Sequence, residues 1–127
     1  MSINKISGAG LTVIGAVTDA GAQDITVRTV LASADASATP ADISAAPASG
    51  EKIVLDDLFL SVDTDLLVTV KEETSGTVML ALYMAAGTAQ QFTPRGKMKL
   101  PVAGKKLQVQ TSATGNIKVT ALTHGEA

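Results

Sequence analysis

The sequence has 127 residues, of which 46% are hydrophobic, yet it holds only two Phe, one Tyr and no Trp. Ten basic and twelve acidic side chains give a net charge of −2. Nucleic-acid binding needs phosphate neutralisation or aromatic stacking, and this composition supplies neither. The chain contains no Cys, so disulfides, thiolate catalysis and Cys-ligated zinc are excluded. One domain with an aliphatic core, with or without an appended arm, is the expectation.

The first 31 residues contain two short apolar runs that predict strands. Residues 11–17, "LTVIGAV", are aliphatic and partly β-branched, and residues 24–31, "DITVRTVL", alternate apolar and polar side chains. The first run imitates the apolar part of a signal peptide, but it is short and Asp19 lies close to the supposed cleavage point. We therefore interpret residues 1–31 as an N-terminal arm or strand pair.

Residues 32–49, "ASADASATPADISAAPAS", are rich in Ala, Ser and Pro. Alanine favours helix, but Pro40 and Pro47 interrupt it, and Ser and Asp compete for backbone hydrogen bonds. Ile43 is the single large apolar side chain in the segment. The composition predicts a linker or an extended crossing segment.

From residue 50 onward the chain alternates between strand and turn signals. Residues 52–62, "KIVLDDLFLSV", predict one strand with Asp56 and Asp57 at a bulge or on the solvent side. Residues 64–73, "TDLLVTVKEE", alternate apolar and polar side chains and predict a second strand. The following "TSG", residues 74–76, is a turn signal.

The next segment, residues 77–86 or "TVMLALYMAA", is apolar on both faces. This pattern favours a central strand covered on both sides, with a buried helix as the competing interpretation. Its apolar run is about half as long as a bilayer-spanning helix requires, so no membrane span is expected. Residues 89–101, "AQQFTPRGKMKLP", predict two short strands around a turn at Pro94–Gly96.

The stretch "KKLQVQTSATGNIKVTAL", residues 105–122, predicts a terminal hairpin. Leu107 and Val109 alternate with polar residues before the turn, and Ile117 and Val119 repeat the pattern after it. One face of this hairpin is expected to pack on a core while the other meets water.

Strands at a spacing of about ten residues, separated by Gly, Ser, Pro and Asn, predict an all-β fold, an antiparallel β-sandwich. We expect six or seven strands from Lys52 to the end and two more before the linker. The expected organisation is an arm over 1–31, a linker over 32–49 and a sandwich over 50–127.

No constellation of reactive side chains is visible. His124 is the only histidine and is expected to be an exposed tail residue, so a catalytic triad and a His-rich metal site are excluded within one subunit. Asp56, Asp57, Asp63 and Asp65 raise the possibility of calcium, but they lack the spacing of an EF-hand loop and are interpreted as solvated turn carboxylates. No catalytic residue, cofactor or metal is predicted, and an enzyme is not expected.

Two stretches between Gly50 and Leu122 are similar to a known class. The "KEETSGTV" turn and the "LQVQTSATGNIKVTAL" ending resemble small β-sandwich virion proteins of tailed bacteriophages, in particular jelly-roll decoration or cement proteins of the capsid. The resemblance implies a homo-oligomer, dimer or trimer, that is made in the host cytoplasm and binds the capsid exterior. It would bridge major capsid subunits, with no cofactor and no nucleic-acid or membrane partner.

Under this resemblance the N-terminal arm is the expected partner contact, with apolar anchors at Leu11, Val13, Ile14 and Val17. The alternative is that these side chains complete the core of their own subunit. A second function also stays open: an adhesive or carbohydrate-binding module of a phage tail or host surface. Such a module normally displays aromatic side chains or calcium, and the chain offers Phe59, Tyr83 and Phe92.

Overall fold

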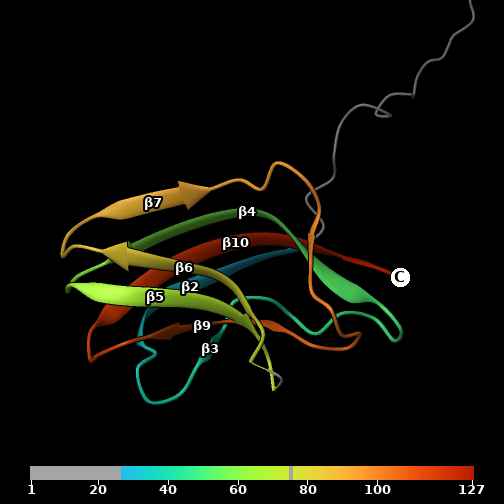
Figure 1. Cartoon of the computed structure of the whole chain (residues 1–127), viewed down its shortest axis with the longest axis horizontal. Helices are drawn as coiled ribbons and strands as arrows, with labels where there is room; N and C mark the ends of the chain where they lie inside the picture. The colour runs from blue at the N-terminus through green and yellow to red at the C-terminus, as the bar shows by residue number, and fades with distance from the viewer. Residues whose placement is uncertain (1–26, 75) are drawn as a thin grey trace, which may run out of the picture.

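The computed structural model describes residues 27–74 and 76–127, and this part of the chain is built from strands and connections without a helix. The strands are β2 (Val27–Asp35), β3 (Ala41–Asp42), β4 (Lys52–Val62), β5 (Leu66–Glu72), β6 (Val78–Met84), β7 (Ala89–Phe92), β8 (Met98–Lys99), β9 (Leu107–Thr111) and β10 (Asn116–Glu126). They form two antiparallel sheets, one ordered β2-β10-β4-β7 with β8 also paired to β4, the other ordered β3-β9-β5-β6. The two sheets pack face to face (Figure 1), so the predicted β-sandwich is confirmed.

The core lies between the sheets and is aliphatic, as the composition predicts. In β5, Leu66, Val68 and Val70 are buried, while the residues between them are half-buried. In β10, Ile117 and Val119 are buried in the same alternating manner. Fully burying one such side chain stabilises the fold by about 1.5–3 kcal/mol. The predicted period-2 alternation of these strands is therefore confirmed.

The predicted terminal hairpin is wrong. β9 pairs with β3 and β5, whereas β10 pairs with β2 and β4, so the two strands belong to different sheets. Residues 112–115 cross from one sheet to the other, and the Asp63 side chain accepts a hydrogen bond of 2.8 Å from the Asn116 backbone at the end of this crossing. Alternation specifies which face of a strand is buried, but not which strand lies beside it.

The bulge predicted in the strand over residues 52–62 is confirmed. Leu122 lies opposite Asp57 and Thr123 lies opposite Leu55, so Asp56 is the extra residue on β4. Its side chain is exposed. A bulge re-aims the side chain at its centre, and here it brings Asp56 to His124 on the neighbouring strand.

β6 is not the central strand that its sequence predicts. Among the described residues it pairs with β5 alone and forms the edge of its sheet. Val78 is 56% exposed and Tyr83 is 88% exposed. The β5–β6 connection is a true hairpin that includes the predicted turn, and Gly76 adopts the left-handed conformation there with φ at 71°.

Residues 32–49 connect the two sheets. Residues 32–35 continue β2, which pairs with β10, and β3 pairs with β9. Ile43 is fully buried, and its backbone N–H donates to the Leu107 carbonyl over 2.9 Å. The segment thus contains the end of β2 and all of β3, and the described sandwich begins at Val27, before Gly50.

Candidate binding surface

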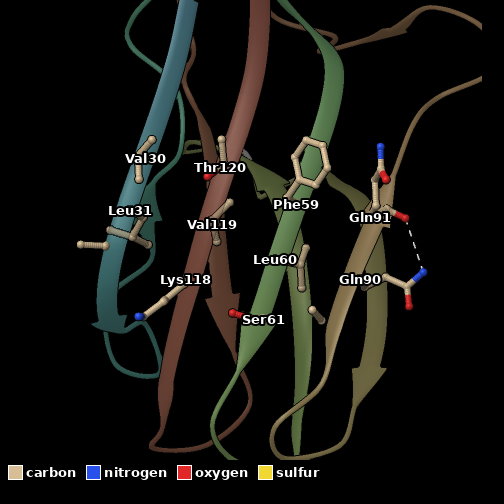
Figure 2. A pocket seen from close by; sticks show the side chains of 12 residues that line it. Val30, Leu31, Phe59, Leu60, Ser61, Gln90, Gln91, Lys118, Val119 and Thr120 are labelled. Carbon is tan, nitrogen blue, oxygen red and sulfur yellow. Dashed lines mark hydrogen bonds between the residues drawn. The ribbon is translucent and has the colours of Figure 1, made fainter.

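The outer face of the β2-β10-β4-β7 sheet is hollowed by a groove of about 670 Å³. Antiparallel pairing places Val30 and Phe59 on either side of Thr120, and Gln91 beyond Phe59. Directly opposite residues in paired strands point to the same face, so these four side chains form one row across four strands. Figure 2 shows the row, with the Phe59 ring standing on β4.

The groove combines apolar and polar side chains. Val30 is 58% exposed and Phe59 is 41% exposed, although both belong to regular strands. Lys118 and Ser61 form the next row across the same face. An apolar centre with polar neighbours is the composition of a recognition surface, because the apolar groups supply contact area while the polar groups orient the ligand.

The β7 side of the groove is held by hydrogen bonds. The Gln91 side-chain amide donates to Asp57 Oδ2 over 3.3 Å, and the Thr93 hydroxyl donates to Asp57 Oδ1 over 2.8 Å. Gln90 Nε2 also donates to the Gln91 carbonyl over 3.4 Å, the dashed line in Figure 2. A side chain that is already oriented loses less conformational entropy when a ligand binds.

A second polar site surrounds His124, and the prediction of an exposed tail residue is wrong. β10 continues to Glu126, so His124 lies inside a strand and pairs with Val54. Its Nδ1 is 2.7 Å from Asp56 Oδ2, and its Nε2 is 2.6 Å from Glu126 Oε2. Both nitrogens donate only in the imidazolium, and the hydrogen bonds to Asp56 and then Glu126 raise the pKa of His124.

Two lysines extend this cluster. Lys97 Nζ lies 2.7 Å from Glu126 Oε1, and Lys99 Nζ lies 3.8 Å from the same oxygen. The Lys97 hydrogen bond, followed by that of His124, lowers the pKa of Glu126 to about 2. Because both ring nitrogens of His124 face carboxylates, the cluster joins β10 to β4 and to the segment around β8.

The cluster predicts how stability depends on pH. The pKa of His124 is higher in the folded chain than its ordinary 6.5, so its contribution is fully present below about pH 6.5 and declines as the pH rises through the folded-state value. The pKa of Glu126 is lowered, so its contribution is present above its ordinary 4.5 and is lost as the pH falls towards about 2. We expect the cluster to stabilise the fold most between roughly pH 4.5 and 6.5.

This expectation is checked by urea unfolding of the wild type and a His124→Gln variant across that range and above it. The stability difference between them should shrink as the pH rises above about 6.5. Because His124 is the only histidine, its folded-state pKa can also be followed by NMR without assignment. A titration midpoint at or below 6.5 would contradict the proposed imidazolium bridge.

Asp63 and Asp65, two of the aspartates interpreted as turn carboxylates, accept hydrogen bonds from backbone N–H groups. Asp63 accepts hydrogen bonds from the backbone and side chain of Asn116 and from Thr64, and these interactions lower its pKa. Asp65 accepts a hydrogen bond of 2.8 Å from the Ala86 backbone.

Residues 27–74 and 76–127 contain no group of three His, Cys, Asp or Glu placed to hold a metal ion. In the same residues, no helix is long and apolar enough to cross a membrane.

The four residues predicted as partner contacts, Leu11, Val13, Ile14 and Val17, lie outside the described residues. The groove itself was not predicted from the sequence. One signal was present: Phe59 shares the alternation phase of Asp57 and Ser61, whereas Leu58 and Leu60 occupy the buried phase. An aromatic residue on the polar phase of a strand is a candidate for an exposed contact.

Comparison with known proteins finds no family model that matches the chain and no matching curated protein. The groove and the exposed strands are therefore the basis for a functional proposal.

Proposed function

We propose that this chain is a structural virion protein that decorates the exterior of a tailed-phage capsid and stabilises it by bridging major capsid subunits. The observation that supports the proposal best is the row from Val30 to Gln91, in which exposed apolar and polar side chains lie across four strands of one sheet. The kind of partner is taken from the resemblance of the "KEETSGTV" turn and the "LQVQTSATGNIKVTAL" ending to jelly-roll decoration proteins. The N-terminal run at residues 11–17 is proposed as an additional contact.

The geometry of the groove suits adhesion to a large protein surface. The row lies on four hydrogen-bonded strands, so a partner would meet it with little change of the backbone. One groove offers a small apolar area, so a single contact is weak. Copies arrayed on a shell, or linked to one another, bind far more tightly than one copy because later contacts form at high effective concentration.

Replacing Phe59 by lysine tests this function. We expect Phe59→Lys to weaken co-sedimentation with empty phage heads by at least about tenfold, because a charge replaces the aromatic ring at the centre of the contact. The fold should persist, since residue 59 faces outward and a lysine there reaches water. The measurement is the bound fraction against protein concentration, with heads of the phage whose genome carries the gene.

Val102→Lys is the matched control. Val102 is 43% exposed, close to the exposure of Phe59, but it is not among the residues that line the groove. This variant should bind heads as the wild type does. Equal binding by Phe59→Lys and the wild type would rule out the groove as the capsid contact.

A glycan is the second candidate ligand, favoured by the polar groups around Phe59. An aromatic ring can cover the apolar face of a sugar, and Gln90, Gln91 and Ser61 provide hydrogen-bonding groups on the same face. A glycan array distinguishes the two functions. Binding of a defined glycan that is lost in Phe59→Lys, together with no binding to heads, would favour the adhesive module.

A further inference from the structure

The sequence of β6 disagrees with its position in the sheet. Residues 78–84, "VMLALYM", contain no charge and no proline, yet the strand lies at an edge. Free edges of natural sheets are normally protected by charged side chains, proline, bulges or coverage, because unpaired N–H and C=O groups recruit further strands. Within residues 27–74 and 76–127, the only such protection of β6 is a bulge at Met79. Among the described residues, β5 is the only strand that pairs with β6. The strand has the composition of one that is paired on both sides.

The side chains of β6 divide between two faces. Leu80 lies opposite Val70 and Leu82 lies opposite Val68, so both leucines face the core, but each is only half-buried. Ala81 lies opposite Thr69 on the outer face and is exposed. The core therefore ends at a border of partly covered leucines, which a further strand beside β6 would cover.

The centre of β6, Leu80-Ala81-Leu82, reads the same in both directions. An antiparallel pair related by a two-fold axis at Ala81 brings Ala81 opposite Ala81 and Leu80 opposite Leu82 of the second copy, whereas Met79 is the extra residue of a bulge on β6 and packs on the core. Such self-complementarity is what a two-fold interface requires, because each residue must fit its counterpart in both directions. We propose that β6 pairs with β6 of a second copy and joins two four-stranded sheets into one continuous eight-stranded sheet.

The size of this interface limits its strength. The seven residues of β6 extend for at most about 24 Å at roughly 3.4 Å per residue, and the bulge at Met79 shortens the regular part. A contact of that length and one sheet in thickness falls below the range of roughly 1,200–2,000 Å² that stable complexes bury. The dimer is therefore expected to dissociate in the micromolar range, on the order expected for a transient interface.

The inference goes beyond the proposed function and does not depend on it. β6 belongs to the β3-β9-β5-β6 sheet, whereas the groove lies on the other sheet. A β6-linked dimer therefore leaves both grooves accessible. Whatever the grooves bind, a dimer presents two of them and can bridge two sites.

Sedimentation equilibrium of the full chain, from micromolar to millimolar concentration, tests the interface. We expect the wild type to show a monomer–dimer equilibrium. Ala81→Lys should raise the dimer dissociation constant at least about tenfold, because it places like charges opposite each other at the two-fold axis. Ala81→Asp should do the same, and an equimolar mixture of the two variants should restore dimers through opposite charges.

Ala89→Lys is the control, since Ala89 is an exposed alanine on β7, an edge strand of the other sheet, and this variant should dimerise as the wild type does. If Ala81→Lys fails to fold, Tyr83→Lys replaces it, at a residue that is 88% exposed. A wild type that stays monomeric at every concentration overturns the proposal. So does a mixture that fails to dimerise, which would point to another segment, such as residues 11–17, at this edge. Head binding without dimers would overturn the β6 pair but leave the proposed function intact.

Discussion

Replacing Ile43 by alanine is expected to lower the free energy of unfolding by about 2–5 kcal/mol, the range for large-to-small changes in a packed core. Ile43 is fully buried, and its backbone is hydrogen-bonded to Leu107 on β9. The next residue, Ser44, accepts a hydrogen bond of 2.8 Å from the Leu107 backbone through its hydroxyl. The loss of the side chain would leave a cavity where the crossing segment meets the core. Urea unfolding followed by circular dichroism measures the change.

Val30→Ala is the control for this experiment. Val30 lies on β2 with most of its side chain exposed, so its truncation should cost well under about 1 kcal/mol. Equal effects of the two substitutions would show that the crossing segment is not an integral part of the sandwich.

Glu72→Ala is expected to destabilise the fold by about 2–4 kcal/mol, because it removes a buried acceptor and leaves its donor without a partner. The Glu72 side chain is fully buried at the end of β5. Its Oε2 accepts a hydrogen bond of 2.9 Å from the backbone N–H of Val102, in the connection between β8 and β9. The carboxyl group therefore attaches this connection to the core. Chemical denaturation with both substituted and wild-type chains measures the loss.

Glu73→Ala is the control, because it removes the same kind of side chain from the neighbouring residue. Glu73 also accepts a hydrogen bond from a backbone N–H, that of Lys106 at 3.0 Å, but its side chain is only half-buried. Water can replace that acceptor, so the loss should stay below about 1 kcal/mol. A loss as large as that of Glu72→Ala would mean that burial is not the source of the difference.

Local pattern in the sequence predicts the faces of the strands well. The alternation in β5 and β10 identifies the buried side chains, and the paired aspartates mark the bulge in β4. These features depend on neighbours a few residues away, which a period of two captures. The β-sandwich follows from the same signals.

Which strands lie side by side, and which isolated residues are buried, depends on the whole fold. The turn after β9 suits a hairpin and a crossing between sheets equally well, and only the assembled sheets distinguish them. Ile43 stands alone among small residues, so no period marks it as core. His124 is hydrogen-bonded to Asp56, which is 68 residues away in the sequence. The groove likewise needs four strands in register before its row exists.

The sequence of β6 and its position at a sheet edge also disagree. Its sequence predicts a central strand covered on both sides, but within residues 27–74 and 76–127 only β5 pairs with it. Pairing with a second copy would reconcile the two and would supply the two-site contact that bridging of capsid subunits needs. The two proposals are compatible: a dimer joined through β6 would carry two grooves, one on each copy.

Electron cryomicroscopy of empty phage heads incubated with the purified protein tests the proposed role most directly. A decorating protein should appear as density on the outer surface of the shell, in contact with neighbouring major capsid subunits and with the β2-β10-β4-β7 sheet facing them. Heads that show no added density at saturating protein, or density confined to the tail, would contradict the role proposed here.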